Sequence, residues 1–157
     1  MVTKEQKRNI EKFFQALDKI SHPPGDLYDL GLIISDIIKA KNLINLAPYP
    51  EKVRVFSLSE KIHPDEFLKQ LVECFKNKKW LLVELKDGYL PGRIYNQLRL
   101  LSIQNRLQIS DLIGKEKEII DLEMPKESRI VFLTSQESLS KIGNPNLIKL
   151  FGPIVKI

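Results

Sequence analysis

The chain has 157 residues, enough for one domain with a substantial core. Hydrophobic residues make up 43% and charged residues 29%, which is typical of globular proteins and excludes a disordered or fibrous chain. The net charge of +5 permits an acidic partner such as nucleic acid without requiring one. No apolar stretch approaches the roughly 20 residues that span a bilayer, so we expect no membrane partner.

The cysteine and histidine content narrows the chemistry further. The single cysteine, Cys74, excludes an internal disulfide and fits a reducing compartment. Residues 1–8 lead into an amphipathic pattern and not into an apolar signal core, so the sequence predicts a cytoplasmic protein. With only two histidines, His22 and His63, we expect no metal site. Cys74 lies on or beside an apolar helix face, which favours a buried, unreactive thiol over a nucleophile.

The N-terminal part, residues 1–48, is predicted to be helical. Residues 4–20 place apolar side chains at helical spacing, and the prolines and glycine of residues 21–25 end that helix. Asp26 is the predicted N-cap of a second helix, whose many isoleucines indicate burial and which runs to about Leu43. Residues 46–50, which include Pro48-Tyr49-Pro50, are predicted to separate this helix from the next element.

From residue 51 to 157 the pattern alternates between strands and helices. The predicted strands are residues 53–58, 80–85, 129–134 and 153–157. The predicted helices begin at Pro64 and near residue 90, the second reaching about residue 106, and a short helix or turn follows at 137–142. Residues 107–109 and 118–122 are predicted to form a hairpin with Gly114 near its turn.

Such alternation implies parallel strands joined by crossover helices. We therefore predict one α/β domain over residues 1–157, with three layers and a mainly parallel sheet of four or five strands. The two N-terminal helices would cover one face of this domain or pack beside it.

Two apolar runs, residues 80–85 and 129–134, are followed by polar residues that candidate ligands could reach. The candidate binding residues at these strand ends are Glu84, Asp87, Ser135 and Gln136. Ligands often bind at this edge of open α/β sheets. Asp87 equally suits an Asp-Gly turn with Gly88.

Residues 53–157 resemble the later part of an AAA-type ATPase core, especially the midasin and dynein branch. Residues 79–84, Lys-Trp-Leu-Leu-Val-Glu, are similar to the family's second nucleotide motif. Residues 128–136 are similar to its sensor strand, and residues 144–152 resemble the segment before its final strand. The resemblance implies that Gln136 or Ser135 stands near the sensor asparagine.

The chain departs from the family where catalysis would need it. No segment fits the phosphate loop G-x-x-x-x-G-K-[ST], and Leu85 follows Glu84 where the family has a second acid. We therefore expect no ATP hydrolysis, no enzyme activity and no cofactor. If the phosphate-loop strand is missing too, the four strands would lie in sequential order, and 153–157 could pair with a second copy.

A basic face is the other candidate site. Arg93, Arg99 and Arg106 recur at about seven-residue spacing on the predicted helix near 90–106, with amides and Tyr95 between them. Such a face can contact phosphates and bases, or it can simply be solvated. The basic run Lys76, Lys78 and Lys79 either joins it or complements a helix C-terminus.

The sequence thus favours a non-catalytic, degenerate P-loop-NTPase-like interaction or regulatory module with a protein partner or a homodimer. The alternative is a small basic nucleic-acid-binding protein. An enzyme that uses Glu84, Asp87 and Gln136 is a third, weaker hypothesis.

Overall fold

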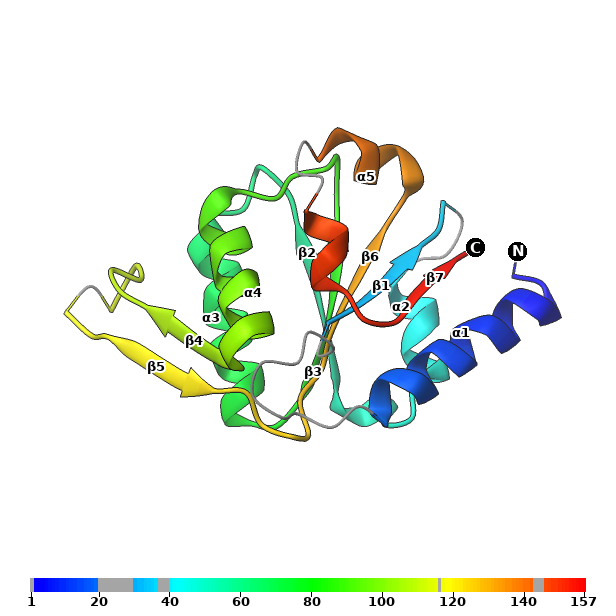
Figure 1. Ribbon diagram of the computed structural model, residues 1–157, viewed down its shortest axis with the longest axis horizontal. Helices are drawn as coiled ribbons and strands as arrows, with labels where there is room; N and C mark the ends of the chain where they lie inside the picture. The colour runs from blue at the N-terminus through cyan, green and yellow to red at the C-terminus, as the bar shows by residue number, and fades with distance from the viewer. Residues whose placement is uncertain (1, 20–29, 37–39, 116, 143–145) are drawn as a thin grey trace.

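The computed structural model of the protein describes residues 2–19, 30–36, 40–115, 117–142 and 146–157 (Figure 1). In chain order the helices and strands are α1 (Lys4–Asp18), β1 (Leu30–Ile34), α2 (Ala40–Leu43), β2 (Val53–Leu58), α3 (Pro64–Lys76), β3 (Trp80–Leu85), α4 (Gly92–Gln104), β4 (Arg106–Ile109), β5 (Ile120–Glu123), β6 (Ile130–Thr134), α5 (Gln136–Lys141) and β7 (Ile154–Lys156). Short 3-10 turns lie at Ile44–Leu46, Pro50–Lys52 and Leu147–Leu150.

Five parallel strands form the central sheet in the order β2-β3-β6-β1-β7. Helices α1 and α2 cover one face of the sheet, and α3 and α4 cover the other (Figure 1). The predicted fold class, a three-layer α/β domain with a mainly parallel sheet, is confirmed. The antiparallel hairpin β4-β5 projects beside α3 and α4, and Gly114 stands at its turn with a φ of 85°.

The predicted second helix, residues 26–43, is wrong over its centre. Leu30–Ile34 is a strand with every residue buried, and only Ala40–Leu43 is helical. Residues 26–29 and 37–39 lie outside the described ranges. A buried central strand and a buried helix both present continuous apolar runs, so apolar spacing alone does not separate them. The N-terminal part therefore supplies the sheet with a strand as well as supplying two helices.

The predicted sequential strand order is also wrong, because β1 lies between β6 and β7. Leu30 pairs with Ile130, and Leu32 pairs with Ile154. Gly31 lets α1 approach this strand closely, since a Cβ at Gly31 would lie 2.7 Å from Cζ of Phe13. Long-range packing thus places β1 in the interior of the sheet, between β6 and β7.

Alternation along the strands divides the core between the two faces. Leu82, Val131 and Leu133 pack against α1, which buries its own apolar side chains Ile10, Phe13, Phe14 and Leu17. The intervening residues Leu81, Val83 and Phe132 pack against α3 and α4. Nearly all side chains of β1, β3 and β6 are therefore buried, whereas those of the outer strands β2 and β7 are largely half-buried or exposed.

The predicted first helix is observed as Lys4–Asp18, and the predicted elements after residue 50 are confirmed with boundaries that shift by one or a few residues. The predicted end of the first helix at residues 21–25 lies outside the described residues. Helix α4 ends at Gln104, because Asn105 adopts a left-handed conformation with φ of 55°. Arg106 therefore belongs to β4 and not to the helix that was predicted to carry it.

Candidate functional site

A pocket of about 400 Å³ lies at the carboxyl ends of β1, β3 and β6. Its lining residues are Ser35, Asp36, Glu84, Leu85, Lys86, Asp87, Leu133, Thr134, Ser135 and Ser138. We call it the carboxyl-edge pocket. Because parallel strands deliver their carboxyl ends to one edge, side chains from distant parts of the sequence meet there.

Three of the four strand-end candidates lie in this pocket, namely Glu84, Asp87 and Ser135. The fourth candidate, Gln136, does not line the pocket. It is the first residue of α5, and its side chain is exposed. Sequence reasoning missed Ser35, Asp36 and Thr134. The signal was present, since two polar residues follow the apolar run 30–34, but that run was interpreted as part of a helix.

Local structure accounts for part of this polar edge. The Ser135 hydroxyl caps α5 by accepting a hydrogen bond from the Ser138 N–H at 3.0 Å. Asp87 and Gly88 form the predicted turn, with φ values of 57° and 68°. The turn abuts α5, because a Cβ at Gly88 would lie 2.6 Å from the Ser138 carbonyl oxygen. Asp87 and Ser135 therefore have structural roles in addition to lining the pocket.

The side chains of the carboxyl-edge pocket carry a net negative charge. Asp36, Glu84 and Asp87 supply three carboxylates against one cation, Lys86. The Lys86 ammonium lies 4.0 Å from the Glu84 carboxylate and partly neutralises it. Across the described residues, no three His, Cys, Asp or Glu side chains are grouped so that they could hold a metal ion. Oxygen atoms that accept hydrogen bonds dominate the site.

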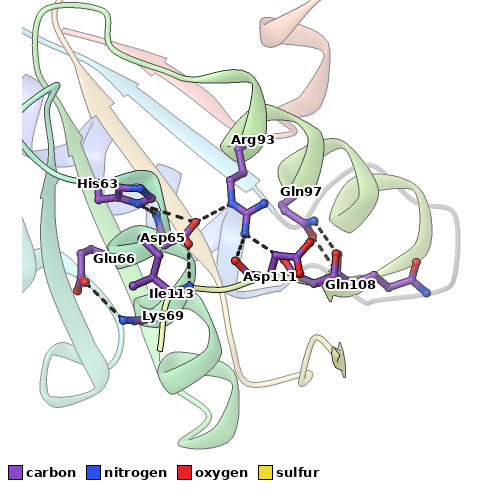
Figure 2. Close-up of polar contacts among 10 residues, drawn as sticks. His63, Asp65, Glu66, Lys69, Arg93, Gln97, Gln108, Asp111 and Ile113 are labelled. Carbon is purple, nitrogen blue, oxygen red and sulfur yellow. Dashed lines mark hydrogen bonds and ion pairs between the residues drawn. The ribbon is translucent and has the colours of Figure 1, made fainter. Parts of the chain in front are cut away.

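The predicted arginine face is largely committed to internal contacts, as Figure 2 shows for Arg93. Its Nε donates to the buried Asp65 carboxylate at 2.6 Å, and its terminal nitrogen donates to the carbonyl of Ser110 at 3.1 Å. The Ile113 N–H donates to the other Asp65 oxygen at 2.9 Å. Asp65 thus joins α3, α4 and the hairpin turn.

The pKa of Asp65 reflects these contacts. Burial by itself raises the pKa, but the hydrogen bond from Ile113 and the hydrogen bond and charge of Arg93 lower it, as does His63. The net pKa lies below the ordinary aspartate value. Asp65 lies in the first turn of α3, but the residue is 2% exposed and its carboxylate acts mainly as a tertiary anchor.

The other two arginines of the predicted face lie in different surroundings. Arg106 pairs with Asp121 across the hairpin at 2.8 Å, and Arg99 is exposed on α4. Gln97 exchanges two hydrogen bonds with the backbone of Gln108, at 2.7 and 3.3 Å (Figure 2). The structure therefore does not bring the three arginines together as a free phosphate-binding stripe.

The lysine run has a different setting. Lys76 lies in the last turn of α3, where it complements the helix dipole, and Lys78 has a φ of 54° in the turn that follows. Lys76 and Lys78 are exposed and Lys79 is half-buried. Lys79 directly precedes β3, so the run lies at the amino edge of the sheet, opposite the carboxyl-edge pocket.

The remaining reactive side chains have structural explanations. Cys74 is buried, and burial raises its pKa to about 11, so its thiol is protonated at neutral pH. His63 caps α3, with Nδ1 accepting a hydrogen bond from the Asp65 N–H at 3.1 Å. His22 lies outside the described residues.

No family model matches the chain, and neither does any curated protein. None of the helices in the described ranges is long and apolar enough to cross a membrane.

Proposed function

We propose that the chain is a non-catalytic interaction or regulatory module with an AAA-type core sheet. Its five parallel strands, numbered in chain order, read 2-3-4-1-5 across the sheet. In this order β1, which precedes the resembling residues 53–157, lies between β6 and β7. The support for the resemblance is the class of the sheet, which is parallel and covered by helices on both faces.

The composition of the carboxyl-edge pocket carries the non-catalytic part of the proposal. Residues 35–42, which follow β1, contain no glycine that would open a backbone cradle for phosphate. Three carboxylates face one lysine in the pocket, so a phosphate group would meet repulsion instead of a cluster of donors.

Thermal unfolding in millimolar ATP with Mg²⁺ tests this part. A nucleotide present at 100 times its Kd would add about 2.7 kcal/mol to the stability. That increment corresponds to a rise in Tm of roughly 5 °C or more for a chain of this size. We expect no measurable rise. A reproducible increase with ATP and Mg²⁺, absent with Mg²⁺ alone, would contradict the proposal.

The outer edge of β7 supports the interaction part of the proposal. The Leu32 N–H donates to the Pro153 carbonyl, and the Ile157 N–H donates to the Ile34 carbonyl, both towards β1. Because bonding residues alternate along a parallel ladder, the backbone groups of Ile154 and Lys156 point outward. Ile154 is also 44% exposed. These outward groups offer a protein strand two pairing positions.

Light scattering of the chain tests self-association at this edge. If copies pair through β7, Lys156→Pro should abolish the dimer, since proline removes an outward N–H and leaves the bonds to β1 in place. The exposed Lys149→Ala serves as a control that should leave the dimer intact. A strict monomer at all concentrations would exclude the homodimer and leave a different protein as the partner.

A further inference from the structure

A second pocket, of about 260 Å³, lies at the amino edge of the sheet, where β2, β3 and β6 begin. Its lining residues are Asp18, Tyr49, Lys52, Trp80, Lys126, Glu127 and Arg129. We call it the amino-edge pocket. Three cations line it against two carboxylates, the reverse of the balance at the carboxyl edge.

An exposed aromatic ring is fixed at the mouth of this pocket. Tyr49 is 41% exposed, and its ring packs edge-on against buried Trp80 with ring centroids 6.3 Å apart. Pro48 and Pro50 flank Tyr49, and Pro50 restricts the Tyr49 backbone, which adopts φ of −130° and ψ of 70°. A ring held in this way can stack on a planar ligand at little entropic cost.

Two lysines, Lys52 and Lys126, line this pocket. The Lys52 ammonium lies over the Tyr49 ring, 5.2 Å from its centroid, so a base would stack on the opposite face of the ring. Neither Lys52 nor Lys126 forms an ion pair with any side chain in the described ranges. They differ in this respect from Arg93 and Arg106, whose guanidinium groups are bound to Asp65 and Asp121.

The floor of the pocket is rigid. Arg129 is 3% exposed and donates to the backbone carbonyls of Leu17, Lys126, Ser128 and Asp18, at 2.8, 2.7, 2.8 and 3.3 Å. These bonds hold the loop that carries Lys126 against the end of α1. Arg129 therefore positions the site, and its fixed charge contributes to the local potential.

The positive charge continues beyond the pocket along the same edge. Val53 of β2 pairs with Trp80 of β3. The residues that directly precede them, Lys52 and Lys79, therefore lie at the starts of adjacent strands on the amino edge of the sheet. Lys78 and Lys76 follow along the turn and the end of α3. An extended chain of phosphates could therefore pass from the pocket onto the lysine run.

We propose that the amino-edge pocket binds single-stranded nucleic acid, with a base stacked on Tyr49 and phosphates at Lys52 and Lys126. The adjacent nucleotides run towards Lys78 and Lys79. The site combines a stacking platform with a cationic path, the two elements by which proteins hold single strands without reading base edges. It is independent of the proposed interaction through β7.

Fluorescence anisotropy with a labelled oligothymidine of about 20 nucleotides tests the proposal on the full chain. Trp80 is the only tryptophan, so its emission reports directly on the pocket. We expect binding that weakens steeply with salt and changes the Trp80 emission. Tyr49→Ala should weaken binding about tenfold or more, because stacking on the ring is lost.

Charge-matched variants separate the site from general electrostatics. Lys52→Glu/Lys126→Glu should lower the magnitude of the salt slope by about 2, one for each lost phosphate contact. Lys61→Glu/Lys149→Glu makes the same change in net charge at two exposed residues outside the pocket, and should leave the slope unchanged. Thermal unfolding of Tyr49→Ala and of both double variants verifies that each variant remains folded at the temperature of the binding assay.

Three results would overturn the proposal. One is equal loss of binding in the two double variants, which would indicate a diffuse charge effect. The second is binding of thymidine monophosphate or inorganic phosphate as tight as that of the oligonucleotide, which would indicate a small-ligand site. The third is an oligonucleotide complex in which neither the Trp80 emission nor the Tyr49→Ala affinity changes.

Discussion

The two edges of the central sheet differ in charge and in how their side chains are held. The carboxyl edge gathers Asp36, Glu84 and Asp87 around one lysine, whereas the amino edge gathers Lys52, Lys126 and Arg129 around a fixed tyrosine. Parallel α/β sheets usually bind ligands at the carboxyl edge, where loops from several strands converge. In this chain the residues best suited to an anion lie at the opposite edge. The position of a pocket in a fold therefore does not specify its ligand, and the side chains must decide it.

The largest expected effect concerns the rigid floor of the amino edge. Arg129→Ala should lower the free energy of unfolding by about 3 kcal/mol or more, because several buried carbonyl groups lose their donor. Urea unfolding followed by Trp80 emission measures the loss. Lys126→Ala, at an exposed residue in the same loop, should stay within about 0.5 kcal/mol of the native chain. Equal stability of the two variants would mean that the amino edge is not rigidly held.

An intermediate effect is expected at Asp65, which anchors the helices that follow the carboxyl ends of β2 and β3. Asp65→Asn should lower the free energy of unfolding by about 1–2 kcal/mol at pH 7. This loss is smaller than that expected on breaking a fully buried ion pair, because the Arg93 side chain is 39% exposed. Among the described residues, the exposed neighbour Glu66 pairs only with Lys69, at 3.6 Å. Glu66→Gln should therefore lower the free energy of unfolding by less than about 0.5 kcal/mol.

The pH dependence of the Asp65 contribution follows from its lowered pKa. The folded state favours the carboxylate, so this stabilisation is complete above the unfolded-state pKa of about 3.9 and is lost as the pH falls through the folded-state value. The difference between Asp65→Asn and the native chain should therefore narrow below about pH 4. A constant difference from pH 7 to pH 3, measured by urea unfolding, would contradict the role assigned to the charge.

The smallest effect tests whether the two edges are independent. Glu84→Gln/Asp87→Asn should change stability by less than about 0.5 kcal/mol, because the Glu84–Lys86 contact is long and partly exposed. The edges are separated by the length of a strand, about 17 Å for five residues. That distance exceeds the screening length of about 8 Å at physiological salt. Oligonucleotide affinity should therefore change less than about twofold, and a larger change would show that the edges are coupled.

Much of the architecture could be predicted from local pattern. The alternation after residue 51 predicted β2, β3, β6 and β7 and the helices between them, because strand and helix periods are short-range properties of the sequence. The hairpin followed from its turn residues. The strand β1 and its place between β6 and β7 could not be predicted, because Leu30–Ile34 carries the same apolar run as a buried helix. Its pairing with β6 joins residues 100 positions apart.

The candidate sites divide in the same way. Glu84 and Asp87 were found because polar residues follow a strand, and their common pocket is consistent with that reasoning. The arginine spacing suggested a binding face, but acids distant in the sequence bind Arg93 and Arg106. The sequence places Tyr49 only in the segment 46–50 between two predicted elements. Nothing nearby in the sequence indicates that Trp80 packs against its ring.

The sequence by itself determined the class of this protein: an α/β chain with buried parallel strands, polar strand ends and no phosphate loop. These properties depend on residue types and spacings within a few positions. Only the tertiary structure decided that β1 is inserted between β6 and β7, which cations pair with acids and which do not. Those outcomes depend on contacts between residues far apart in the chain, where burial and pairing override local preference.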